Sequence, residues 1–100
     1  MADYSVLLTL KIVPERLAEF EAMMDAEAPL TRAFEGCELF EVYVLDAASG
    51  DVLFLEHWRT EDDSQAYGRW RAERGDLERL GAFFSGPPAR AVLRRISAPA

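Results

Sequence analysis

The sequence has little of the chemistry that disulfides and metal sites need. Its 100 residues include one cysteine, Cys37, and one histidine, His57. A single cysteine excludes an intrachain disulfide, and one cysteine with one histidine cannot supply a structural zinc site. Cys37 lies between Gly36 and Glu38, with no cationic neighbour to lower the pKa of its thiol, so we interpret it as a small buried residue.

Other absences narrow the functional classes. The chain has no Gly-rich phosphate loop, no dinucleotide fingerprint and no Ser-His-acid signature, so any enzyme here would work without a nucleotide. No apolar run approaches the roughly 20 residues of a membrane span, and residues 1–4 lack the features of a signal peptide. The expected location is the cytoplasm. A net charge of −7 argues against nucleic acid and against anionic membranes as partners.

Apolar and aromatic residues are abundant by contrast. Half of the sequence is hydrophobic, and eleven per cent is aromatic. That is more apolar material than one small core requires, and oligomerisation would bury the remainder. The length predicts one domain over residues 1–100, with a core at about 4–96 and a tail at 97–100.

The hydrophobic periodicity predicts alternating strands and helices. Strands are expected at 4–13, 38–45, 52–59 and 89–97. A helix should begin at Pro14 and be broken or kinked at Pro29; others are expected at about 61–74 and 76–84. The order β-α-β-β-α-β predicts an α+β, ferredoxin-like fold: a four-stranded antiparallel sheet with helices on one face. Because the other face is also apolar, a second copy of the chain is expected to cover it.

The third expected strand carries two ionisable residues in its apolar sequence. Alternation places Glu56 and Trp58 on one face, and His57 on the other. Glu56 is either a structural carboxylate, paired with an arginine of the last strand (Arg90, Arg94 or Arg95), or a catalytic one. His57 is a general base if it faces a pocket, and interface packing if it faces a partner chain.

Large aromatics follow on the next helix. Tyr67, Trp70 and Arg74 share the spacing of one helical face, and we expect that face to meet the sheet near Trp58. Phe83 and Phe84 can join this group. The aromatics either fill the core or line a cavity for a flat aromatic ligand, whose oxygen could bond Tyr67 or Trp70. The flanking Arg69 and Arg71 are interpreted as solvated or ion-paired.

These features together resemble the antibiotic biosynthesis monooxygenase family of dimeric α+β barrel proteins. The matching segments extend from about residue 4 to 96. They are Val13-Pro14, Glu35-Gly36-Cys37, Leu55-Glu56-His57-Trp58, and the acidic helix start Thr60-Glu61-Asp62-Asp63.

The resemblance implies a homodimer with one pocket per subunit, between the sheet and the helices. It also implies cofactor-independent oxidation of a small polycyclic aromatic or quinol by O2. Glu56 and Trp58 match the family's strand-final Glu-x-Trp. Tyr67 stands where many quinol-oxidising members have a histidine followed by leucine, and here glycine follows. Combining this resemblance with the residue patterns above, we expect a site with Tyr67 as hydrogen-bond donor and His57 as base. Glu56, Trp58, Trp70, Phe83 and Phe84 are expected around the substrate.

The haem-degrading branch of the same fold is a poorer match. Its members need an asparagine on the first strand and a histidine on a helix, whereas this sequence has no asparagine and its one histidine lies on an expected strand. No haem and no other cofactor is therefore expected. The alternative to an enzyme is a non-catalytic dimeric domain that binds a small aromatic ligand, and a third possibility is a purely structural domain.

Overall fold

The computed structural model describes residues 4–97, which form one antiparallel sheet covered by helices. In chain order the elements are β1 (Tyr4–Lys11), the 3-10 helix η1 (Pro14–Arg16), α1 (Leu17–Ala33), β2 (Cys37–Asp46), β3 (Asp51–Trp58), α2 (Glu61–Glu73), α3 (Asp76–Gly81) and β4 (Ala89–Leu93). The strand order is β2-β3-β1-β4, with antiparallel pairing throughout. The ferredoxin-like α+β fold expected from the sequence is confirmed.

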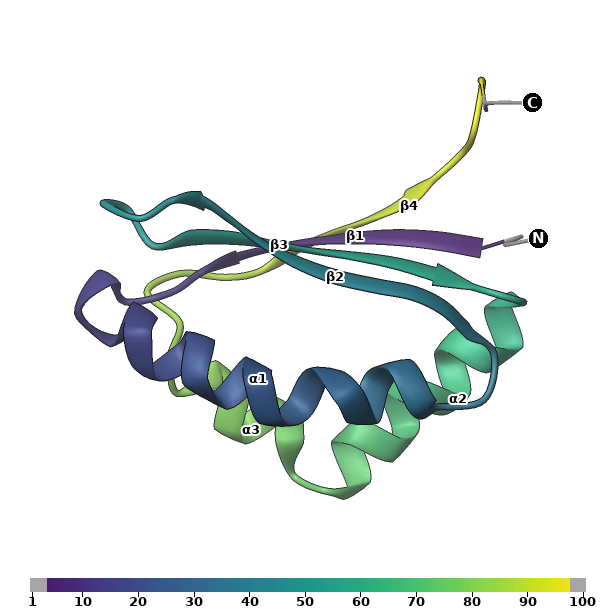
Figure 1. Ribbon diagram of the computed structural model, residues 1–100, viewed down its shortest axis with the longest axis horizontal. Coiled ribbons are helices and arrows are strands. Elements are labelled where there is room, and N and C mark those ends of the chain that lie inside the picture. Colours follow the sequence, from purple (N-terminus) through teal and green to yellow (C-terminus); the bar gives the residue numbers. More distant parts are fainter. Residues whose placement is uncertain (1–3, 98–100) are drawn as a thin grey trace.

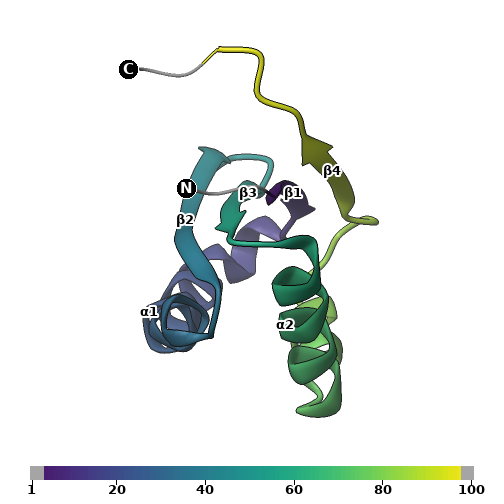
Figure 2. The ribbon, with the colours of Figure 1, turned by 90° about the vertical axis from the view of Figure 1, so that its right-hand side faces the viewer.

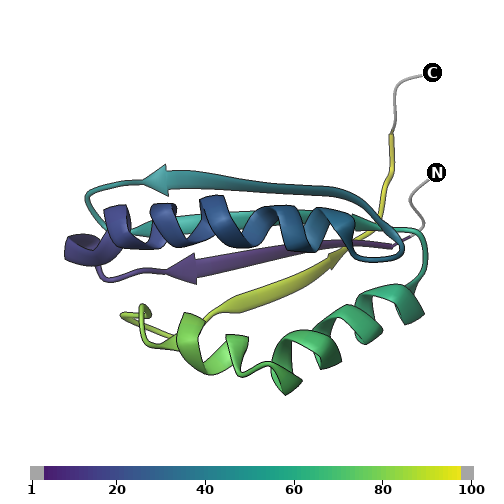
Figure 3. The same cartoon turned by 60° about the horizontal axis from the view of Figure 1, so that its bottom comes forward.

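All three helices lie on the same side of the sheet (Figure 1). Seen from the end, α1 lies beneath the β2 side of the sheet and α2 lies beneath the β4 side, so the two helices are spaced apart beneath the sheet (Figure 2). From the helical side, α1 crosses the sheet lengthwise while α2 and α3 follow one another beside β4 (Figure 3). None of the helices in the described part of the chain is long and apolar enough to cross a membrane.

The core forms where the inward-facing residues of the strands meet α1. In β3, alternate residues from Val52 to Trp58 are buried, as the period of a strand requires. The buried apolar residues are Val6, Leu10, Ile12, Leu17, Phe20, Ala28, Phe40, Val52, Phe54, Trp58 and Phe83. Burial of these side chains is the main favourable contribution to folding.

Of the two effects expected at Pro29, a break or a kink of the first helix, the break is wrong. Helix α1 continues through Pro29 to Ala33. A proline inside a helix removes one backbone hydrogen bond, but here the final turn is held by tertiary contacts. Thr31 is 1% exposed and bonds Tyr67 of α2, and Arg32 Nε donates to the carbonyl of Phe40 at 3.1 Å.

Other elements end earlier than expected. Strand β4 ends at Leu93 rather than at residue 97, and the chain beyond it rises away from the sheet (Figure 1). Helix α3 ends at Gly81, because the chain turns back to the end of β1: Val13 N donates to the Phe83 carbonyl and Ser85 N donates to the Lys11 carbonyl. The break between α2 and α3 is at Gly75 as expected, where φ is +76°, a value that favours glycine.

The sheet face away from the helices is uncovered in the single chain. Register and alternation place Leu53, Leu55 and His57 of β3 on it, beside outward residues of the neighbouring strands. Tyr43 and Leu93 on this face are 47% and 40% exposed. We call this surface the open face.

Candidate functional site

A cavity of about 420 Å³ lies between the sheet and the helices. That volume is in the range of small-molecule sites. Much of its wall is apolar and comes from both layers: Val6, Leu8, Phe40 and Phe54 of the sheet, and Met23, Met24, Leu77 and Leu80 of the helices. The polar groups in the wall are Glu27, Thr31, Glu56, Ser64, Gln65, Tyr67, Arg71, Asp76, Arg79 and Arg90.

Glu56 is the ionisable group on the sheet wall that is most deeply buried, at 5% exposed. It points inward because it occupies an inward position of β3 opposite Val6 and Phe40. The indole Nε1 of Trp58, two residues along the same face, donates to Glu56 Oε1 at 2.9 Å. Burial raises the pKa of the Glu56 carboxyl above its usual value, while the Trp58 hydrogen bond and the charge of Arg90 oppose that shift.

Of the three arginines that the sequence offered as partners for Glu56, Arg90 is the one whose charge acts on it. Arg94 and Arg95 follow the end of β4 and are exposed. Arg90 makes no hydrogen bond to Glu56; its Nη2 donates to the Tyr4 hydroxyl at 3.2 Å. Glu56 thus accepts a hydrogen bond from the Trp58 indole and feels the charge of Arg90 at a distance, without forming an ion pair with it.

Tyr67 faces Glu56 from the helical wall. It is held by two neighbours: its hydroxyl lies 2.7 Å from Thr31 Oγ1 of α1 and accepts from Arg71 Nε at 2.9 Å. Burial raises the pKa of Tyr67, and the bonds from Thr31 and Arg71 oppose the rise. The negative charge of Glu56 makes a smaller contribution in the same direction as burial.

Arg71 joins the three helices at the base of this wall. Its Nη1 lies 2.8 Å from Asp76 Oδ2 of α3 and 3.2 Å from Glu27 Oε2 of α1, and its Nη2 donates to Thr31 Oγ1 at 2.9 Å. A second donation reaches the Glu27 carbonyl at 3.2 Å. The planar guanidinium suits this role because it presents five donors in a fixed geometry.

The bonding pattern leaves one hydroxyl proton available. Arg71 donates to both Tyr67 and Thr31, and one of these hydroxyls donates to the other. Each hydroxyl has a single proton, so the pair retains one that neither contact uses. Both residues line the cavity, and this proton can therefore be donated to an oxygen of a ligand.

The sequence correctly brought three large aromatics together. The Tyr67 ring centroid lies 4.9 Å from that of Trp58 and 6.1 Å from that of Trp70. Phe34 packs against all three, at 5.2 to 6.3 Å. Of the four, Tyr67 lines the cavity, whereas Trp58, Trp70 and Phe34 form an aromatic cluster behind it.

Three predicted site residues lie away from the cavity. His57 faces the open face of the sheet, with Ser5 and Leu39 as its neighbours in register. Phe83 packs on Phe20 and under the guanidinium of Arg16, and Phe84 bridges to Ile12. Both phenylalanines are at the far end of the core because the chain turns back after Gly81. The structure thus gathers Glu56 and Tyr67 at the cavity, and Trp58 and Trp70 next to it.

The residues that sequence reasoning missed are Glu27, Thr31, Arg71 and Asp76. The sequence could have indicated them through the choice of which face of α2 points inward. The buried positions of this helix include Ser64 and Arg71, with half-buried Tyr67 between them. The helical spacing of Tyr67, Trp70 and Arg74 instead predicts an inward face that includes Trp70. Trp70 packs behind Tyr67, with the guanidinium carbons of Arg71 and Arg74 4.9 and 4.7 Å from its ring centroid.

Within residues 4–97, no group of three His, Cys, Asp or Glu side chains is arranged to hold a metal ion. Cys37 is half-buried at the start of β2, and burial raises the pKa of its thiol, in keeping with an unreactive residue.

Comparison with known proteins agrees with this architecture. A putative antibiotic biosynthesis monooxygenase from Bordetella bronchiseptica is 21% identical, with a TM-score of 0.79, over 97% of this chain and 100% of the other. The monooxygenase from the gene ActVA-Orf6 of Streptomyces coelicolor, solved with the ligand nanaomycin D, is 13% identical with a TM-score of 0.79, over 99% and 92%. A conserved protein from Methanosarcina mazei Go1 is 20% identical with a TM-score of 0.83, over 95% and 94%.

At these identities the likeness to solved structures shows a shared fold. No curated protein matches the chain in sequence. Residues 3–73, well over half of the chain, match the family described as antibiotic biosynthesis monooxygenase. The chain therefore belongs to the antibiotic biosynthesis monooxygenase family.

Proposed function

We propose that the protein is a cofactor-independent monooxygenase that oxidises a small polycyclic aromatic or quinol with O2 in the sheet–helix cavity. The observation that best supports this is the placement of a buried carboxylate, Glu56, and a hydroxyl, Tyr67, on facing walls of one largely apolar cavity. A proton acceptor and a donor facing each other across such a space match the needs of proton removal from an activated aromatic.

Glu56 is the group that we propose as the base. Burial raises the pKa of this carboxyl, so its ionised form is a stronger base than the carboxylate of a solvated glutamate. A base whose pKa lies nearer the working pH transfers protons more efficiently. The Trp58 indole keeps the carboxylate aimed along the inner face of β3.

Tyr67 and Thr31 supply the matching donor. When the substrate loses its proton, negative charge develops on its ring oxygen, and the unused hydroxyl proton of the pair stabilises it. Arg71 strengthens this donor because its cationic N–H groups polarise both hydroxyl oxygens.

For an anthrone the reaction balances without any cofactor. Glu56 accepts one proton from the ring methylene, and the carbanion transfers one electron to O2. The resulting radical and superoxide combine into a carbon–oxygen bond, which forms a peroxide anion that takes a proton back from Glu56. Loss of water from the hydroperoxide leaves the ring carbonyl, so one oxygen atom enters the product and the other leaves as water.

His57 has no part in this scheme. The sequence left open whether it acts as a base or packs against a partner chain, and its place on the open face favours the partner chain. We infer that the protein is a homodimer in which two open faces meet, since exposed apolar residues on that face, Tyr43 and Leu93 among them, need cover. Sedimentation equilibrium tests this: L55D, which places a charge on the open face, should yield monomers, and an unchanged dimer would contradict the inference.

Oxygen uptake tests the proposed activity. With 1,8-dihydroxyanthrone as substrate, the wild-type protein should consume O2 faster than buffer does, and E56Q should lose about 10²–10⁴-fold of that rate. Y67F should lose less, because Thr31 keeps its own hydroxyl. H57Q is the matched control and should retain the wild-type rate. Uptake equal to that of buffer would refute the proposal, and tight binding without uptake would favour a non-catalytic aromatic-binding domain.

A further inference from the structure

We propose that the ligand of the cavity carries a carboxylate beside its aromatic body, and that Arg90 is the residue that recognises it. This inference rests on the cavity being the ligand site of the proposed function, and it narrows the class of substrate to aromatic acids.

Most of the cavity's charges neutralise each other at one place. Glu27 and Asp76 are each contacted by both Arg71 and Arg79. Arg74 also reaches Asp76, at 3.3 Å. This cluster at the α2–α3 junction therefore has no free carboxylate and no unpaired guanidinium to offer a ligand.

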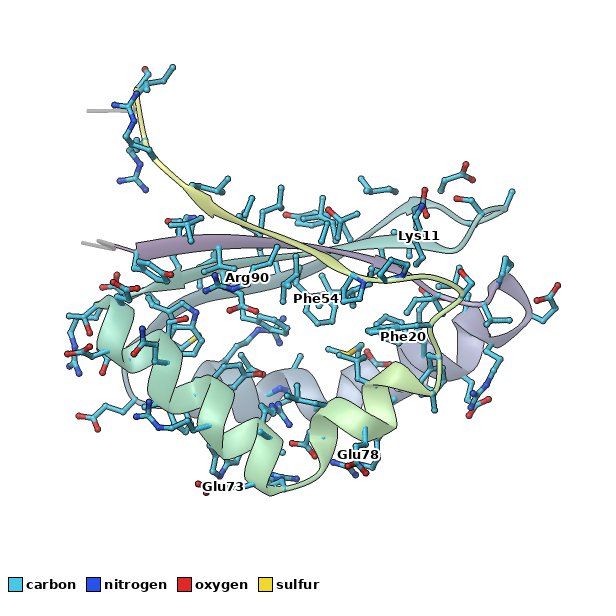
Figure 4. All side chains as sticks on the ribbon, turned by 180° about the vertical axis from the view of Figure 1, so that it is seen from behind. Lys11, Phe20, Phe54, Glu73, Glu78 and Arg90 are labelled. Carbon is cyan, nitrogen blue, oxygen red and sulfur yellow. The ribbon has the colours of Figure 1, made fainter. Side chains whose placement is uncertain are left out.

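Arg90 differs from the other cavity arginines. It lies on the edge strand β4, opposite Leu8 of β1. Figure 4 shows its side chain on the side of the sheet that faces the helices, near Phe54. Its Nη2 donates to the neutral Tyr4 hydroxyl, at 3.2 Å. Among the residues that the structure describes, no carboxylate lies within ion-pair distance of Arg90.

Glu56 does not form an ion pair with the Arg90 guanidinium. It accepts a hydrogen bond from Trp58, and Arg90 acts on it only through space. The Tyr4 bond uses one of five guanidinium N–H groups, and Arg90 is exposed at the cavity rim. The remaining N–H groups can form the paired hydrogen bonds that arginine makes with carboxylates.

The adjacent apolar wall fits the other half of such a ligand. Leu8 and Phe54 line the cavity next to Arg90, and the flexible Met23 and Met24 lie on the α1 side. An aromatic body packed there would place a ring substituent at the rim, beside the guanidinium. A carboxylate bound at Arg90 would also shield its charge from Glu56 and so raise the pKa of the proposed base.

Equilibrium binding of two oxidised, unreactive probes tests the inference apart from catalysis. Anthraquinone-2-carboxylate should bind the wild-type protein at least about tenfold more tightly than 2-(hydroxymethyl)anthraquinone, since a charge-assisted pair replaces water contacts. R90Q should lose this preference and keep its affinity for the neutral probe. R94Q is the matched control, because Arg94 follows the same strand outside the cavity lining, and it should bind both probes as wild type does.

Equal affinities for the two probes, a preference that survives in R90Q, or no binding of either probe would each overturn the inference. The far-ultraviolet circular dichroism of R90Q must match wild type, and R90K serves as a second variant that keeps the charge without the forked geometry. Neither probe can be oxidised at its ring carbonyls. A carboxylate preference among these probes, together with no oxygen uptake from 1,8-dihydroxyanthrone above that of buffer, would refute the proposed activity while leaving the assignment of Arg90 intact.

Discussion

Replacing Arg71 by methionine should destabilise the protein severely. Its side chain is 9% exposed and contacts Glu27, Thr31, Tyr67 and Asp76 at 2.8 to 3.2 Å. Removing one partner from a buried ionic group costs about 3–5 kcal/mol, because the charges left behind are no longer compensated. Arg79 still pairs with Glu27 and Asp76 in the variant, so we expect the lower end, about 3 kcal/mol.

Urea unfolding at pH 7 and one fixed protein concentration measures this loss, since association alters apparent stability. With a slope of about 1–3 kcal/mol/M, the midpoint of R71M should fall by about 1–3 M. R69M is the matched control: Arg69 is exposed on the same helix, and its replacement should change the free energy of unfolding by less than about 0.5 kcal/mol. A loss below about 1 kcal/mol in R71M would refute the view that this network holds the helical wall together.

Two further predictions concern Glu56 and Gly36. The pKa of Glu56 is raised in the folded state, so the native protein binds the proton of this carboxyl more tightly than the unfolded chain does. The contribution of Glu56 to stability therefore falls as pH rises from the ordinary carboxyl pKa of 4.5 through the raised folded-state pKa. The free energy of unfolding of E56Q minus that of wild type should accordingly increase with pH between 4 and 8, and a constant difference would contradict the shift. Gly36 has φ of +89° and a Cβ there would overlap the Asp63 side chain, so G36A should cost at least about 1–2 kcal/mol. G68A, at an open helical position, should instead gain up to about 1 kcal/mol, and equal effects of the two changes on the melting temperature would show the reasoning to be wrong.

The fold was predictable from sequence because its signals are local and repeated. The alternation from Val52 to Trp58, the cap at Thr60 and the break at Gly75 each specify a neighbouring stretch of backbone, and the structure contains all three. The break predicted at Pro29 does not form, because tertiary contacts in the next turn outweigh the backbone hydrogen bond that proline removes. The local sequence does not reveal those contacts.

The site was less predictable for a related reason. Glu56 and Tyr67 could be singled out because each is unusual on its own element. The hydroxyl of Tyr67 is held by Thr31 of α1 and by Arg71 of its own helix, and Arg71 is held in turn by Asp76 of α3. Thr31 and Asp76 have no sequence feature that links them to α2. Alternation along β3 predicts that His57 and Glu56 lie on opposite faces of the sheet. It does not predict which of the two faces borders the cavity, because that depends on where the helices pack.

The hydrogen bond from Trp58 to Glu56 has a consequence for how this family member can diverge. Replacing Trp58 first would leave a buried carboxylate without its donor, whereas replacing Glu56 by glutamine first leaves the indole with an uncharged acceptor. The acid can therefore be lost before the tryptophan at small cost, but the tryptophan cannot easily be lost before the acid. Relatives that have the tryptophan without the acid should therefore be more common than relatives that have the acid without the tryptophan.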